Sequence, residues 1–111
     1  MLSEKILRSI SNGLVRTLIL SILSKKPVSG YSLLKEVEQI TGVAYHAGVL
    51  YPILYGMEDT GLISGEWTFK GRRRIKHYAI TEKGLITLER LRSFIRNPVK
   101  EILGENGSIP A

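Results

Sequence analysis

Residues 63–80 read ISGEWTFKGRRRIKHYAI, and their hydrophobic period of two differs from the helical spacing of the chain before them. The segments ISGEWTF (63–69) and IKHYAI (75–80) alternate apolar and polar residues, as half-buried strands do. Between them stands KGRRR (70–74), so the pattern predicts a β-hairpin with a loop at 70–74. Five cationic side chains gather near its tip: Lys70, Arg72, Arg73, Arg74 and Lys76.

Three core helices and a short preliminary helix are predicted before this hairpin. Apolar residues at helical spacing indicate one at 13–25, preceded by a short preliminary helix at 2–10 with a break at Ser11–Asn12. Ser29 is a suitable N-cap for a helix over 30–41, and Gly42 is a suitable C-terminal cap for the same helix. We expect Tyr31, Leu33, Leu34, Val37 and Ile40 to form its inward face.

A third helix is predicted over 47–60, with Leu50, Ile53, Leu54 and Met57 as its buried row. Pro52 lacks an N–H group, so an irregular first turn is expected there, and Gly61 should end the helix.

A final helix is predicted to follow the hairpin, with Thr81 as its N-cap and Glu82 in its first turn. Apolar residues at 85, 88, 91 and 95 form a stripe along it. Asn97–Pro98 is expected to break this helix and to start a short one that ends at Gly104.

The predicted fold class is mainly α with a two-stranded β-wing, a winged helix-turn-helix plus a C-terminal dimerisation helix. Residues 1–80 would form the DNA-binding domain, in which the N-terminal helix at 1–12 aids dimerisation. Residues 81–104 would form the dimerisation helix, and 105–111 a flexible tail.

Double-stranded DNA is the predicted partner, because such folds place a helix in the major groove and a basic wing on the adjacent backbone. The third helix supplies candidate groove contacts, and the wing supplies candidate phosphate contacts. The full candidate set is Tyr45, His46, Val49, Tyr51, Tyr55, Lys70, Arg72, Arg73, Arg74 and Lys76. These residues have simpler alternative roles. Tyr51 or Tyr55 could pack on the second helix, and His46 could cap the third helix. The basic residues could merely protect an exposed strand edge from aggregation.

The overall composition agrees with this interpretation. The 111 residues carry a net charge of +6, which favours an acidic partner. No cysteine is present, and neither a signal-peptide pattern nor an apolar run of membrane-spanning length is recognised, so we expect a cytoplasmic, DNA-associated protein.

Three longer stretches resemble the PadR family of transcriptional regulators. They are LILSILSKKPVSGYSLLKEVEQITG (18–42), HAGVLYPILYGMEDTGLIS (46–64) and GRRRIKHYAITEKG (71–84). Gly48, Tyr51 and Pro52 match the family's pattern, whereas His46 and Val49 stand where it usually has serine and threonine. The short C-terminal region is similar to that of the compact members.

The resemblance implies a homodimeric repressor that binds palindromic sites and, in some members, is released by a small hydrophobic ligand. It implies that the C-terminal helix, helped by the first helix, makes the dimer. The chain supplies apolar residues for that interface: Leu2, Ile6, Ile10, Leu88, Leu91, Phe94, Ile95, Val99 and Ile102. A C-terminal helix folded back on its own core is the alternative.

Two other classes of function were weighed. An enzyme is not expected, since Asp59, nine glutamates, His46 and His77 are scattered and no catalytic, metal-ligand or phosphate-loop spacing occurs. No cofactor is predicted either. A winged-helix module for protein–protein contact, without DNA readout, is the remaining alternative.

Overall fold

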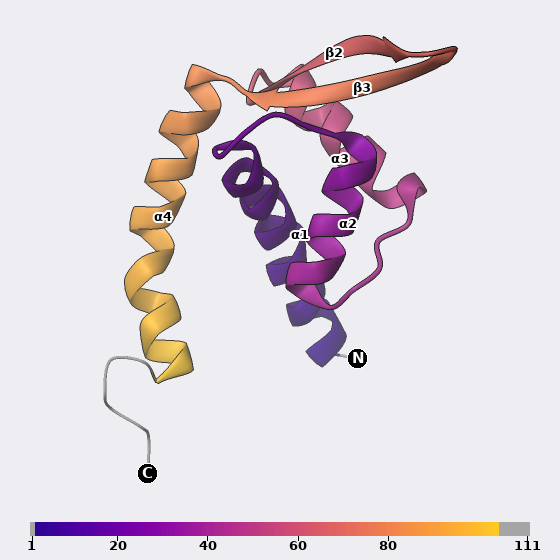
Figure 1. Cartoon of the computed structure of the whole chain (residues 1–111). Helices are drawn as coiled ribbons and strands as arrows, with labels where there is room; N and C mark the ends of the chain where they lie inside the picture. The colour runs from indigo at the N-terminus through magenta and orange to yellow at the C-terminus, as the bar shows by residue number, and fades with distance from the viewer. Residues whose placement is uncertain (1, 105–111) are drawn as a thin grey trace.

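The computed structural model of the chain describes residues 2–104, apart from the side chain of Leu2. Figure 1 shows three helices beneath a small sheet, with a fourth helix beside them. The helices are α1 (Leu2–Leu23), α2 (Gly30–Thr41), α3 (Ala47–Asp59) and α4 (Glu82–Leu103). The strands are β1 (Val28–Ser29), β2 (Ile63–Lys70) and β3 (Arg73–Ile80). The predicted winged helix-turn-helix fold is confirmed; the predicted tail, 105–111, lies outside the described residues.

The helix ends follow the capping residues that the sequence supplies. The Ser29 hydroxyl accepts a hydrogen bond from the Ser32 N–H at the start of α2, and Gly42 ends that helix with φ at 74°. At the start of α4, the Thr81 hydroxyl accepts from the Gly84 N–H. These local bonds fix where the two helices begin and where α2 ends.

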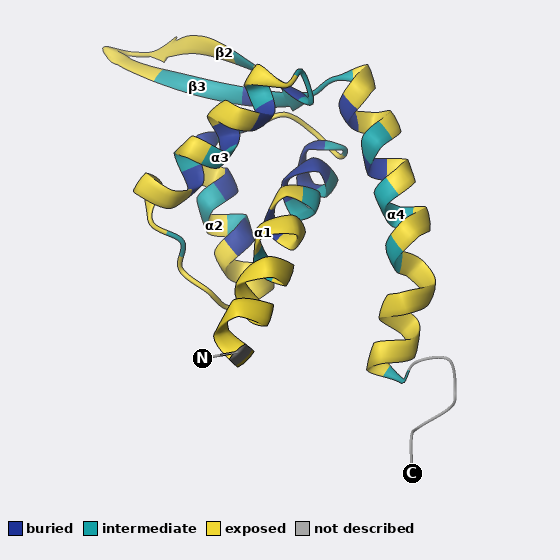
Figure 2. Cartoon of the chain, turned by 180° about the vertical axis from the view of Figure 1, so that it is seen from behind, coloured by how far each residue is buried: buried dark blue, intermediate teal, exposed yellow. Residues whose placement is uncertain are grey.

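The hydrophobic core lies where α1, α2 and α3 meet beneath the sheet (Figure 2). Its most buried side chains come from every helix and from both long strands: Ile19, Leu20, Leu23, Leu33, Val37, Leu50, Leu54, Ile63, Tyr78 and Leu88. The expectation for α3 holds for Leu50, Leu54 and Met57, while Ile53 is half-buried. The inward face predicted for α2 was wrong at Tyr31 and Ile40, which are 63% and 60% exposed. The buried row of α2 consists of Gly30, Leu33 and Val37.

Two predicted helix breaks do not occur. α1 continues through Ser11 and Asn12, because the Ser11 hydroxyl bonds to the Tyr45 hydroxyl at 3.1 Å and does not compete for the backbone. α4 continues through Pro98, which is exposed, so water can solvate the backbone carbonyl that the missing N–H group leaves unpaired. α3 likewise runs through Pro52.

The sheet has three antiparallel strands in the order β1-β3-β2, one more than predicted. β1 pairs Val28 with Tyr78, and a two-residue strand is too short to show a period. β2 and β3 pair from Ile63–Ile80 to Lys70–Arg73, so the predicted loop at 70–74 shrinks to Gly71 and Arg72. Gly71 has φ at 65°, the positive value that a two-residue hairpin turn requires at its first position.

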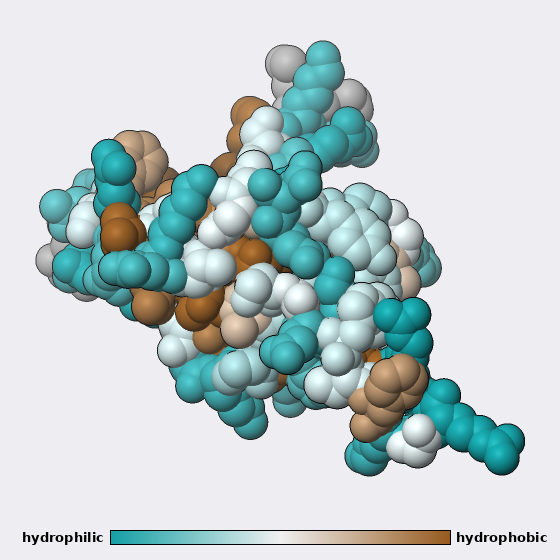
Figure 3. Space-filling model, turned by 90° about the horizontal axis from the view of Figure 1, so that it is seen from above, coloured by the Kyte–Doolittle hydropathy of each residue, from teal (hydrophilic) through white to brown (hydrophobic). Residues whose placement is uncertain are grey.

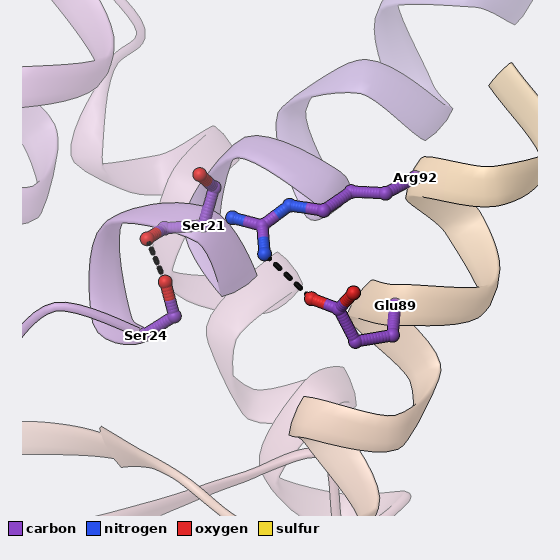
Figure 4. A network of polar contacts seen from close by, with 4 residues as sticks. All are labelled: Ser21, Ser24, Glu89 and Arg92. Carbon is purple, nitrogen blue, oxygen red and sulfur yellow. Dashed lines mark hydrogen bonds and ion pairs between the residues drawn. The ribbon is translucent and has the colours of Figure 1, made fainter. Parts of the chain in front are cut away.

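α4 lies alongside the C-terminal part of α1, and Figure 4 shows the polar side of this contact. Arg92 extends from α4 toward the last turns of α1, where the Ser24 hydroxyl donates to the Ser21 carbonyl at 2.6 Å. Its Nη1 also donates to Glu89 at 2.7 Å. A cation at this place complements the negative end of the α1 dipole.

The segment Ser3–Leu23 of α1 is long and apolar enough to cross a membrane. A run of this length was not recognised in the sequence, because a break was predicted at Ser11–Asn12. The core helix of a soluble protein passes the same test of length and composition. In this fold the C-terminal half of α1 supplies Val15, Ile19 and Leu20 to the core.

We expect Gly84→Ala to lower the free energy of unfolding by about 1–3 kcal/mol, because the added Cβ overpacks a filled site. That Cβ would overlap the Leu62 carbonyl oxygen and lie 2.7 Å from Ile80 Cγ1. Gly56→Ala in α3 is the control: a Cβ there meets nothing within 4 Å, and alanine favours the helix by about 1 kcal/mol. Urea unfolding of both variants measures the difference, and equal shifts would contradict this packing.

Candidate nucleic-acid interface

The tip of the β2–β3 hairpin carries an unpaired cationic cluster. Lys70, Arg72, Arg73 and Arg74 are all exposed, and within residues 2–104 none of these arginines forms an ion pair with a carboxylate. Figure 3 shows the hairpin tip projecting from the body with hydrophilic residues on its outside. Cations held out in this way are available to a polyanion.

Arg74 is oriented by an aromatic neighbour on the facing strand. Its guanidinium carbon lies 4.4 Å from the centre of the Trp67 ring. Such stacking leaves the edge of the guanidinium free to donate hydrogen bonds. The contact therefore restrains the side chain without neutralising it.

A groove of about 300 Å³ separates the hairpin from α2 and α3. Tyr51 and Tyr55 stand on its α3 side, with ring centres 6.5 Å apart. Arg73 and Arg74 stand on its hairpin side, and Tyr31 adds a wall from α2. The structure thus brings the tyrosine face of α3 and the arginines of the wing to the same space.

The predicted contacts on α3 differ in their accessibility. His46 is the N-cap residue, and its exposed side chain forms no capping bond. Val49 and Tyr55 are 50% and 55% exposed. Tyr51 is half-buried, since its ring packs so closely on Gly30 that a Cβ there would lie 2.7 Å from the ring. Tyr45 turns toward α1, where its hydroxyl bonds to Ser11, and we leave it out of the proposed contacts.

Lys76 does not join the exposed cluster as the sequence suggested. Its Nζ donates to Glu58 Oε1 of α3 at 2.8 Å, and its side chain is only 16% exposed. The hydrogen bond to Glu58 raises the pKa of Lys76 despite the opposing effect of desolvation. Burial raises the pKa of the neighbouring Tyr78 phenol. Lys76 therefore stays charged at neutral pH, with its charge already paired.

The sequence missed three exposed aromatic residues beside these cations. Trp67 and Phe69 are 50% and 72% exposed, because the hairpin extends past the helices. Tyr31 lines the groove, and Lys35 lies 5.1 Å from its ring centre. Strand alternation correctly places Trp67 and Phe69 on one face, but it carries no information on where the core ends.

The residues predicted for a dimer interface differ in how far they are exposed. Ile6, Ile10, Phe94 and Ile102 are 61%, 54%, 77% and 79% exposed, and Val99 is also exposed. Leu91 and Ile95 are half-buried. Leu88 was a wrong choice, since it is 1% exposed and belongs to the chain's own core. The side chain of Leu2 lies outside the described residues.

Comparisons with known proteins agree with this geometry. Residues 19–90 match the Transcriptional regulator PadR-like family. The chain is 36% identical over 84 residues to the transcriptional regulator YqjI of Escherichia coli K12; the match covers 74% of this chain, which spans 39% of that relative's length.

Solved structures show the same fold. A protein of Thermoplasma acidophilum superposes with a TM-score of 0.79 at 27% identity, over 92% of this chain and 99% of that one. A PadR family transcription regulator of Clostridium difficile superposes with a TM-score of 0.72 at 28% identity, over 85% and 98% of the two chains.

We expect Lys76→Met to lower the free energy of unfolding by about 1 kcal/mol at pH 7, because the ion pair and the ring contacts are lost. A raised pKa stabilises the fold below the unfolded value, 10.5 for lysine and 10.0 for tyrosine, and this stability is lost as the pH rises through the folded value. Lys76 lowers the pKa of Tyr78, so the comparison is made in a Tyr78→Phe background, where the lysine titration stands alone. There the chain that keeps Lys76 should lose more stability between pH 9 and pH 11 than the chain that also carries Lys76→Met. Urea unfolding across this pH range measures the loss of stability. Equal losses in the two proteins would contradict the ion pair between Lys76 and Glu58.

Proposed function

The chain belongs to the PadR-like family of transcriptional regulators, and on this premise we propose that it is a homodimeric repressor that binds a palindromic operator in double-stranded DNA. The family is one of transcriptional regulators. Since such regulators act on DNA, the proposal includes a cytoplasmic, DNA-associated location and no catalytic activity. The observation that carries the finer proposal is the groove that the α3 tyrosines and the wing arginines share.

In the proposed complex, the N-terminal part of α3 enters the major groove. His46 and Val49 stand at that end with free side chains, and Tyr55 follows on the exposed face. Arg72, Arg73 and Arg74 then meet phosphates on the adjacent backbone, each contact releasing counterions. The unpaired state of these arginines supports this role, because no internal ion pair has to be broken.

The proposed dimer uses the apolar surface that one copy leaves uncovered. The distal half of α4 exposes Phe94, Val99 and Ile102, and the N-terminal half of α1 exposes Ile6 and Ile10 (Figure 2). Exposed apolar helix faces of this kind are candidates for an interaction site in a soluble protein. A second copy is the proposed occupant, since a two-fold axis would also supply the two half-sites of a palindrome.

Repression requires only that the dimer occupy a site that overlaps a promoter. The proposal includes release by a small hydrophobic ligand. Its supporting observation is an apolar hollow of about 460 Å³ between α1 and the end of α2, lined by residues such as Leu7, Leu14 and Ile40. Hollows of this size suit drug-sized ligands.

A protein–protein module with the same fold is the competing function. Its partner would have to be acidic, and its affinity would depend less steeply on salt than DNA binding does. Selection of bound duplexes from random DNA, followed by a salt series on the selected site, distinguishes the two.

We expect Arg73→Ala to weaken binding to selected and random duplexes by similar factors, because phosphate contacts carry no sequence information. The slope of log affinity against log salt should fall by about 0.9. Arg90→Ala, on the exposed face of α4, is the control because it removes the same charge away from the wing. An Arg73 variant with the slope of the control would show that this side chain meets no phosphate.

We expect Phe94→Glu to convert the dimer to monomers, because an unpaired carboxylate would be buried in the interface. Ser93→Glu is the control, since Ser93 lies on the polar side of the same helical turn. Sedimentation velocity measures both. A wild-type chain that sediments as a monomer, or a Phe94 variant that stays dimeric, would remove this interface.

A further inference from the structure

We propose that Lys76 is a positioning residue that fixes the angle between the wing and α3, so that it sets DNA affinity without contacting DNA. We call the set of Lys76, Glu58 and Tyr55 the Lys76 clamp. The inference rests on the DNA-binding function proposed above, and it gives Lys76 a different role from that of the neighbouring arginines.

The clamp joins the two DNA-facing elements directly. Lys76 lies in β3, whereas Glu58 and Tyr55 lie in α3. The ammonium donates to Glu58 Oε1 at 2.8 Å and lies 5.2 Å from the Tyr55 ring centre. On the wing side it lies 5.6 Å from the ring centre of Trp67 and 5.2 Å from that of Tyr78. One cation is therefore held by both elements at once.

Gly65 in β2 is what allows the lysine to reach α3. A Cβ at this position would overlap Cε of Lys76 and would lie 3.0 Å from Glu58 Oε2. Glycine weakens a strand, and its presence within one commonly marks a close approach. Here the missing side chain leaves the path along which the Lys76 stem crosses the facing strand.

The clamp sits at the last rung where the wing is anchored. Trp67 pairs with Lys76, and beyond that rung residues 68–74 are all exposed. Strands rise about 3.3 Å per residue, so Arg73 lies about 10 Å farther out. A tilt of about 20° at the clamp would move it by about 3 Å, enough to break a hydrogen bond to phosphate.

A fixed wing also changes the cost of binding. An unanchored hairpin would lose conformational freedom when its arginines reach the backbone, and that loss would reduce affinity. The clamp holds the wing at one angle in the free protein, so less conformational freedom is lost on binding. Since Lys76 is protonated at neutral pH, the restraint is present in the free protein.

The decisive variant is Glu58→Gln. It raises the net charge by one, so simple electrostatics predicts tighter binding to DNA. It also gives Lys76 a neutral amide oxygen in place of a carboxylate, so the hydrogen bond across the clamp is weakened. A weakened clamp predicts weaker binding, because the wing is held less firmly. We expect Glu58→Gln and Lys76→Met each to weaken binding to a selected duplex by about 3–10-fold. The salt slope of both should stay within about 0.3 of the wild-type value, because no phosphate contact is removed.

Two further variants complete the test. The double variant Glu58→Gln/Lys76→Met should bind no more weakly than the Lys76 single variant, because the two residues act as one unit. Lys70→Met is the matched control: it removes an exposed wing lysine outside the clamp, and it should lower the salt slope by about 0.9 if Lys70 meets a phosphate.

Trp67 gives a readout that does not depend on DNA. It is the only tryptophan in the chain, and Lys76 packs on it. Release of the clamp should lower its fluorescence anisotropy in the free protein, whereas Lys70→Met should leave it unchanged. Circular dichroism at the assay temperature verifies that each variant is folded.

Each outcome decides between the roles. Tighter binding by Glu58→Gln, together with a Lys76→Met salt slope reduced by about 0.9, would make Lys76 a phosphate ligand and overturn the inference. Unchanged Trp67 anisotropy in both variants would overturn it as well. A wild-type chain that binds no duplex would refute the proposed function instead, and the anisotropy would still report on the clamp.

Discussion

The arrangement of this protein depends on the burial of one row of α3. Leu50, Leu54 and Met57 are 0%, 0% and 3% exposed, and they fix the rotation of the helix against α1 and α2. With that row inside, helical geometry leaves Val49 and Tyr55 to face solvent. A helix that rotated by a quarter turn would lose this burial, at a cost of about 1.5–3 kcal/mol for each large apolar side chain. The direction of the side proposed to face DNA is therefore a consequence of core packing.

The cationic stretch shows how position alone divides similar residues between two roles. Arg73 and Arg74 extend past the core and keep their charge for a partner, whereas Lys76 lies close enough to α3 to pair with Glu58. A half-buried ammonium without a carboxylate would be costly, so pairing follows from its depth. At the tip no such cost arises, because water solvates the guanidinium groups.

Local rules predicted the local features. The caps at Ser29 and Thr81 and the alternation of the hairpin depend on neighbours within a few residues, so the sequence contains them in full. Several failures depend on tertiary surroundings. Tyr45 across from Ser11 keeps α1 continuous, and Glu58 turns Lys76 inward, yet neither partner is adjacent in sequence. Leu88 shows the same limit, since an apolar stripe does not distinguish a chain's own core from an interface.

In the proposed dimer, the apolar face of α4 would link the stability of each chain to the spacing of the two copies on DNA. Its first turns bury Gly84 and Leu88 in the chain's own core, while Phe94 and Ile102 farther along remain uncovered. Each protomer would thus fix α4 to its own DNA-binding unit at one end and to its partner at the other. Because α4 is one continuous helix through Pro98, it would connect these two contacts in the proposed dimer. Half-sites one turn of duplex apart, about 34 Å, are the spacing that a two-fold pair of such units would impose.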